Sequence, residues 1–195
     1  MGDKFSDRTK LKYSGWKKRY AYLDNYKQGM DGKYVYYGRH YILKGDISQL
    51  KKLRLMSILT ITVLVAMFIA GGCMDAGAIW GKWYVIIPYA LELIFIFLLG
   101  WKTLSLITEK YPVKEYVYKK TVPWWSFFAI TTVVFCGISV CTTIICMLSV
   151  PDFVKIPGCI IYIITKLISA AACLVFNAQQ KKIEWELDPS EEPEL

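Results

Sequence analysis

The sequence predicts an all-α integral membrane protein with four transmembrane helices. The prediction rests on four long apolar stretches and on a hydrophobic share of 55% over 195 residues, which exceeds the usual value for a soluble domain. A membrane span needs about 20 predominantly apolar residues. The expected spans are about 55–74, 83–107, 122–149 and 156–179. Four such segments in a short chain leave too little polar surface for a soluble protein.

Lysine and arginine are unevenly distributed between the segments that flank these spans. More than half of the 24 lysines and arginines lie in residues 1–54, and a second group lies in 102–121. The two short loops carry only Lys82 and Lys155. Because positive charge stays on the cytoplasmic side, we expect both termini in the cytoplasm. No signal-peptide core and no glycosylation sequon are visible, which favours a bacterial plasma membrane.

Residues 1–46 are expected to form a separate cytoplasmic segment with a helix and a hairpin. In 14–29, aromatic and leucine side chains recur every three or four residues, which indicates a helix that ends near Gly29. Its basic and aromatic side chains could lie on anionic lipid headgroups, or the helix could pack on the protein's own cytoplasmic segments. The side chains expected to face lipid are Trp16, Lys17, Lys18, Arg19 and Tyr20.

Two extended runs on the cytoplasmic side predict a small β-sheet. Residues 31–46 are rich in Tyr, Val and Ile between Asp-Gly and Gly-Asp, a pattern typical of a hairpin. A hairpin is marginal without a third strand, so we expect 115–119 to pair with it. Asp46 and a glutamine three residues later predict that the first membrane helix begins near Ile47. The tail, 181–195, is acidic and contains prolines, and is expected to be solvated or disordered.

Glu92 and Lys166 are the two charges expected near the middle of the membrane. Glu92 lies 9 residues after Trp83, and Lys166 lies 9 residues after Pro157, on helices that run in the same direction. A shift of 74 residues aligns the two halves of the chain and superimposes Glu92 on Lys166, which suggests a duplicated helical hairpin. Each charge alone costs about 2.5–3.5 kcal/mol in a bilayer. We therefore expect the two to pair if their helices meet.

Three interpretations of these charges remain open. A Glu92–Lys166 pair could set the register of the bundle. Glu92 could instead be an ion or proton site, within a polar pocket next to the helix bend that a proline would cause. Either charge could also pair with another subunit. The residues expected to line such a pocket are Pro88, Thr142, Thr143 and Tyr162.

The remaining chemistry-bearing residues do not form an enzyme motif. The chain has one histidine, His40, and no Cys-x-x-Cys, so neither a histidine metal cluster nor a dithiol site is predicted. Cys73 and Cys159 both lie near the outer surface and could form a disulfide, or they could be free thiols. We expect no enzyme activity, metal or cofactor.

The function expected from these features is that of a non-catalytic membrane subunit. It would act as an accessory, scaffolding or regulatory component, with lipid and either a membrane-protein partner or a second copy as its contacts, and without nucleic acid. The alternative is a small ion- or proton-coupled transporter or channel subunit that uses Glu92.

Overall fold

The computed structural model describes residues 25–28, 34–36, 38–44, 47–149 and 155–189. It is mostly helical, and its long helices are α2 (Ile47–Gly72), α3 (Trp83–Ile107), α4 (Glu115–Ser149) and α5 (Ile156–Gln180). All four are long and apolar enough to cross a membrane. Large hydrophobic side chains such as Leu59, Phe97 and Leu167 are exposed on their outer faces. The prediction of four long apolar helices is therefore confirmed.

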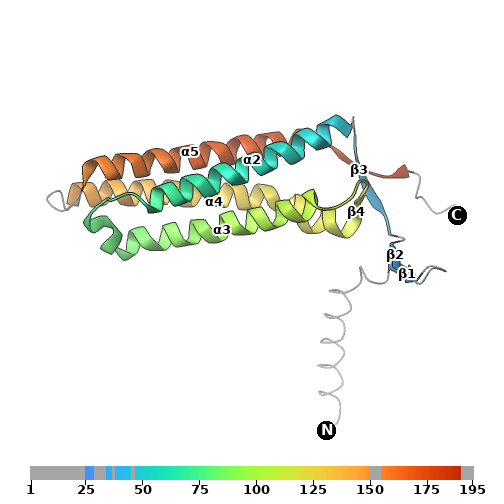
Figure 1. Ribbon diagram of the computed structural model, residues 1–195, viewed down its shortest axis with the longest axis horizontal. Helices are drawn as coiled ribbons and strands as arrows, with labels where there is room; N and C mark the ends of the chain where they lie inside the picture. Colours follow the sequence, from blue (N-terminus) through green and yellow to red (C-terminus); the bar gives the residue numbers. More distant parts are fainter. Residues whose placement is uncertain (1–24, 29–33, 37, 45–46, 150–154, 190–195) are drawn as a thin grey trace, which may run out of the picture.

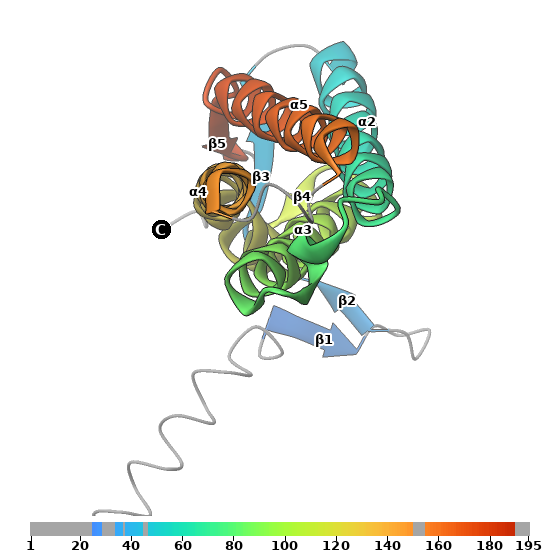
Figure 2. The ribbon, with the colours of Figure 1, turned by 90° about the vertical axis from the view of Figure 1, so that its left-hand side faces the viewer.

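The four helices form an up-and-down bundle in which consecutive helices run in opposite directions (Figure 1). α3 packs against α4, α4 against α5, and α5 against α2. Viewed along the bundle, α3 and α5 lie at opposite corners (Figure 2). A contact between α3 and α5 must therefore cross the centre of the bundle.

The start of α4 differs from the prediction. The helix begins at Glu115 instead of near residue 122, and it includes the run 115–119 that was expected to be a strand. An acidic residue in the first turn interacts favourably with the helix dipole. Glu115 also forms an ion pair with Lys119, one turn later, at 2.5 Å. These local interactions favour a helix over the strand that the Tyr-Val-Tyr composition suggested.

A three-stranded antiparallel sheet covers one end of the bundle, here called the sheet end (Figure 1). Its central strand is β3 (His40–Leu43), flanked by β4 (Val113–Lys114) and β5 (Trp185–Leu187). The connection between α3 and α4 thus contributes a strand, but this strand ends just before residues 115–119, where the strand was predicted.

The strand β5 lies in the tail that was expected to be solvated or disordered. Residues 185–187 are ordered as a strand, although Glu186 and Leu187 are exposed to solvent. Trp185 packs against Tyr118, with ring centroids 5.5 Å apart, and against a buried leucine cluster. One half-buried tryptophan and the backbone pairing with β3 stabilise this strand. The prediction considered the acidic composition of the whole tail and not the local Trp-Glu-Leu sequence that forms the strand.

The hairpin also differs from the prediction. β1 (Tyr26–Gln28) pairs with β2 (Tyr34–Tyr36), whereas residues 40–43 belong to the other sheet. Residues 26–28 are therefore a strand and not the end of a helix. The rings of Tyr26 and Tyr36 lie 5.1 Å apart, and Tyr36 lies 5.9 Å from Tyr116 at the start of α4. The rest of the predicted amphipathic helix, with its basic and aromatic residues, lies outside the described residues.

The opposite end of the bundle, here called the loop end, is closed by the short 3₁₀ helix η2 (Ala78–Gly81) between α2 and α3. A small buried cluster there contains Ile79, Val85, Cys146 and Cys159. Cys159 is buried in this cluster, whereas Cys73 is exposed, and both are free cysteines. The suggested Cys73–Cys159 disulfide is therefore not formed in this structure.

Candidate functional site

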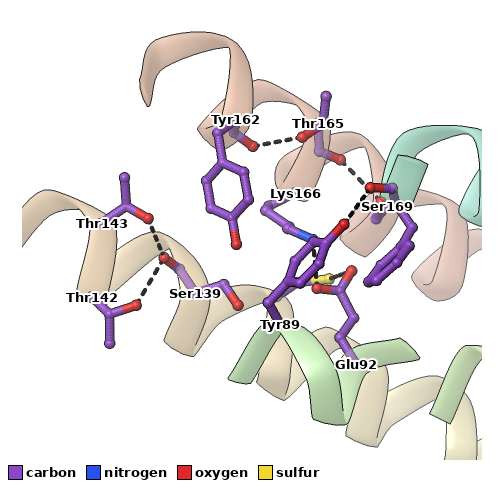
Figure 3. Close-up of polar contacts among 11 residues, drawn as sticks. Tyr89, Glu92, Ser139, Thr142, Thr143, Tyr162, Thr165, Lys166 and Ser169 are labelled. Carbon is purple, nitrogen blue, oxygen red and sulfur yellow. Dashed lines mark hydrogen bonds and ion pairs between the residues drawn. The ribbon is translucent and has the colours of Figure 1, made fainter. Parts of the chain in front are cut away.

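Glu92 on α3 and Lys166 on α5 form an ion pair inside the bundle (Figure 3). Lys166 Nζ donates a hydrogen bond to Glu92 Oε2 at 2.6 Å, and neither side chain has any exposed surface. The two residues lie at similar distances from the loop-end starts of α3 and α5. Because α3 and α5 are diagonal, the long lysine side chain crosses the centre of the bundle instead of joining neighbouring helices.

Three aromatic rings surround the lysine ammonium. Lys166 Nζ lies 4.5 Å from the ring centroid of Tyr89, 5.1 Å from that of Tyr162 and 5.3 Å from that of Phe68. The electron-rich face of an aromatic ring attracts a cation, most strongly where water is excluded. The rings come from α3, α5 and α2, so three helices contribute to one cation site.

The remaining polar atoms around the pair are mostly occupied as well. The thiol of Cys136 on α4 donates a hydrogen bond to Glu92 Oε1, with Sγ and Oε1 3.5 Å apart. The Tyr89 hydroxyl donates to the backbone carbonyl of Phe68 at 2.9 Å, and the two rings are stacked at 4.2 Å. These contacts fix the carboxylate against α4 and the Tyr89 ring against α2. All four helices are thereby connected through one cluster.

This cluster is suited to specifying which helix faces meet. Moving two charges out of water costs several kcal/mol each, so a buried pair contributes little net stability, but removal of one partner typically costs about 3–5 kcal/mol. An arrangement with Glu92 and Lys166 apart would leave both charges in an apolar interior. We therefore expect the pair to favour the arrangement of helix faces that brings Glu92 and Lys166 together.

The predicted pocket residues divide into two groups. Tyr162 is part of the cluster, and Pro88 is buried one turn before Glu92. Thr143 instead donates to the carbonyl of Ser139 on its own helix, at 2.7 Å, and Thr142 donates to its own helix at 3.0 Å. The two threonine donors are therefore directed to α4 and not to the ion pair (Figure 3).

Three members of the cluster were not identified from the sequence. Tyr89 precedes Glu92 by three residues and therefore shares its helix face, a signal that could have revealed it. Cys136 and Phe68 lie on other helices, and nothing in their local sequence indicates the contact. Their position follows from the packing of α4 and α2 around the pair.

Two buried hydroxyl groups, on α4 and α5, interact with each other, and one of them belongs to a ring that contacts the Lys166 ammonium. Ser139 Oγ on α4 and the Tyr162 hydroxyl on α5 make no hydrogen bond of normal geometry within the described part of the chain. Figure 3 shows both near Lys166. Buried polar groups are usually hydrogen-bonded. These two hydroxyls therefore give the cluster a small polar side whose hydrogen bonding is incomplete.

The comparisons with known proteins do not identify a family for this chain. No protein-family model, no curated protein and no solved structure matches it. Within the described ranges, no three His, Cys, Asp or Glu side chains converge in a way that could hold a metal ion. The function is therefore argued from the geometry of the bundle.

Proposed function

We propose that this protein is a non-catalytic multi-pass membrane protein that acts as an accessory, scaffolding or regulatory subunit of a membrane assembly. It would reside in a bacterial plasma membrane with both termini in the cytoplasm. A membrane-protein partner or a second copy of the chain would complete the assembly. The charge distribution along the sequence supports this orientation.

One observation carries this proposal: the two charges in the middle of the membrane neutralise each other within one chain. Glu92 and Lys166 are paired at zero exposure, with aromatic rings around the ammonium. The pair thus needs no partner subunit, and among the described residues it leaves no unpaired buried charge in the centre of the bundle for chemistry on a solute. The outer faces and ends of the protein remain as its surfaces for function.

The sheet end supports the same proposal. Its three strands come from the N-terminal segment, the α3–α4 connection and the C-terminal tail. At the ends of β3 and β5, the exposed Lys44 Nζ lies 3.1 Å from Glu186 Oε1 and 3.5 Å from Glu184 Oε2. A surface assembled from three distant segments forms only in the folded bundle, which is a useful property for a docking face.

Site-specific photocrosslinking in native membranes tests this proposal. A photoreactive residue would replace Glu186 at the sheet end or Leu174 on the outer face of α5, both of which are exposed. We expect one abundant adduct of defined mass, identified by mass spectrometry as one particular protein or as a second copy. A photoreactive residue at the buried Leu99 is the control. If photocrosslinking at both exposed positions yielded monomer and no adduct, the proposal would be overturned.

The second candidate function is a small ion- or proton-coupled transporter or channel subunit. It is favoured by the buried hydroxyls of Ser139 and Tyr162, which make no hydrogen bond of normal geometry within the described part of the chain. Polar groups inside a membrane bundle commonly mark a solute path. In this mechanism, a solute would reach the hydroxyls and weaken the pairing of Glu92 with Lys166.

Flux measurements in liposomes separate the two functions. Purified protein would be reconstituted and assayed for proton, sodium and potassium movement. The double variant Glu92→Gln with Lys166→Met keeps the volume of the pair but removes the carboxylate. Transport requires flux in the wild type and its loss in a folded double variant, whereas the subunit proposal predicts no flux in either protein.

A further inference from the structure

A basic pocket opens at the sheet end, between the beginning of α2 and the end of α5. Its volume is about 450 Å³. The polar lining consists of Gln49 and Lys52 from α2, and of Gln179 and Lys182 from α5 and the residues after it. Leu53 and Met56, in the next turn of α2, provide apolar lining. The pocket thus combines two cations and two amides with an apolar wall.

The two lysines of this pocket are not neutralised within the described part of the protein. Neither Lys52 nor Lys182 has an ion pair there, and no acidic side chain lines the pocket. Glu184, the residue before β5, instead forms an ion pair with Lys44.

A second pocket at the same end shows a different arrangement. It has a volume of about 250 Å³ and includes Glu109, which pairs with Lys114 at 3.0 Å, while Lys102 donates to a backbone carbonyl. Its lining thus contains one acidic side chain, Glu109, as well as the two lysines Lys102 and Lys120. The pocket between α2 and α5 differs because its lining contains Lys52 and Lys182 but no acidic side chain among the described residues, and it is therefore suited to an anion.

The position of the pocket along α2 indicates an amphiphilic ligand. Lys52 lies in the second turn of the helix, about 8 Å from its start at 1.5 Å per residue. Immediately beyond it, Leu55 and Leu59 are 67% and 57% exposed, and the apolar surface continues along the helix. The lysines are thus at the boundary between charged and apolar surface. A phosphate at the lysines would place an attached acyl chain along the exposed face of α2.

We propose that this pocket binds the phosphate-bearing headgroup of an anionic phospholipid. Lys52 and Lys182 would contact the phosphate, the amides of Gln49 and Gln179 would donate to its oxygens or to the glycerol, and an acyl chain would lie against Met56 and Leu55. Basic pockets between transmembrane helices at a membrane surface are suited to such headgroups. The ligand would hold the start of α2 and the end of α5 together, because one lysine lies on α2 and the other lies two residues after α5.

The test uses the full-length protein in delipidated detergent micelles, titrated with phosphatidylglycerol or phosphatidylcholine and followed by native mass spectrometry. The double variant Lys52→Gln with Lys182→Gln removes both pocket cations. The matched control is Lys51→Gln with Lys181→Gln, which changes the same charge at adjacent positions that do not line the pocket. Each lysine near an anionic lipid is worth about fivefold in affinity, the equivalent of ~1 kcal/mol.

We expect the wild type to retain phosphatidylglycerol in preference to phosphatidylcholine, and the pocket variant to lose at least tenfold in affinity while the control changes by about twofold or less. Equal losses in both variants would overturn the pocket and indicate diffuse attraction. Binding of soluble glycerol 1-phosphate as tightly as the lipid would overturn the lipid assignment in favour of a free phosphate.

A measurement on the wild type keeps the proposal testable if the variants do not fold. Lysine acetylation would be compared in nanodiscs of phosphatidylglycerol and of phosphatidylcholine, and mapped by mass spectrometry. The proposal predicts that the anionic lipid protects Lys52 and Lys182 more than their neighbours Lys51 and Lys181. Equal protection of all four lysines would contradict it.

Discussion

Two ion pairs at different depths connect α5 to earlier parts of the chain. Glu92–Lys166 lies in the middle of the bundle with zero exposure, whereas Asp75–Lys155 lies at the loop end, where its side chains are 68% and 62% exposed. The inner pair is covered by aromatic rings and a thiol. The outer pair is solvated, with one additional hydrogen bond from the Gly77 backbone to Asp75.

This difference shows that the same chemistry has different roles at the two depths. Exposed ion pairs contribute little to stability because water competes for both charges and salt screens them. An interior pair has no such competitor, so either charge without the other is strongly unfavourable. We therefore expect the inner pair to determine helix arrangement and the outer pair to follow from backbone packing around it.

The largest expected effect comes from breaking the inner pair. Glu92→Gln leaves the Lys166 ammonium buried without a carboxylate, and should lower the free energy of unfolding by about 3–5 kcal/mol. Lys166→Met should do the same to Glu92. The double variant should recover part of the loss, measured by denaturant unfolding in micelles. Strictly additive losses would show that the two side chains do not interact.

A smaller effect is expected from the backbone contact next to the outer pair. A Cβ atom at position 158 would collide with the backbone carbonyl of Asp75. Gly158→Ala should therefore destabilise the protein by about 1–3 kcal/mol, the usual cost of overpacking. Gly137→Ala on α4 is the control, because nothing lies within 4 Å of a Cβ there. Equal thermal midpoints for both variants would refute the expected role of backbone packing.

The hydroxyl of Tyr89 separates the aromatic contribution from the hydrogen bond at the inner site. Tyr89→Phe keeps the ring beside Lys166 and removes the bond to Phe68, so a loss of about 1 kcal/mol is expected. Tyr89→Leu also removes the ring and should cost more, because a desolvated cation–π contact is worth about 2 kcal/mol. Identical unfolding free energies for the two variants would indicate that the ring contributes nothing.

The smallest effect is expected from the outer pair, and it depends on pH. The hydrogen bond from Lys155, with that from the Gly77 backbone, lowers the pKa of Asp75 below its ordinary value. A carboxyl whose pKa is lowered by folding stabilises the protein above its unfolded pKa and loses this contribution as pH falls through the folded pKa. Asp75→Asn should therefore match the wild type's thermal midpoint most closely below pH about 4. A difference that grows as pH falls would contradict this.

The sequence by itself determined the local and compositional features of this protein. Four apolar stretches long enough to cross a bilayer specify four helices, because in hydrocarbon a helix satisfies its own backbone hydrogen bonds. The start of α2 at Ile47 and the bounds of α3 could also be predicted. The pairing of Glu92 with Lys166 could also be predicted, because two opposite charges at equal depth on parallel helices would otherwise each be buried without a counter-charge.

Only the tertiary structure decided how distant segments meet. That α3 and α5 are diagonal, that Phe68 and Cys136 contact the pair, and that β5 joins β3 are consequences of packing between segments far apart in the chain. No periodicity within one segment encodes such contacts. The strand β5 formed because short segments with mixed propensity adopt the conformation that their neighbours stabilise, whereas the helix at 115–119 is favoured by the local Glu115–Lys119 pair.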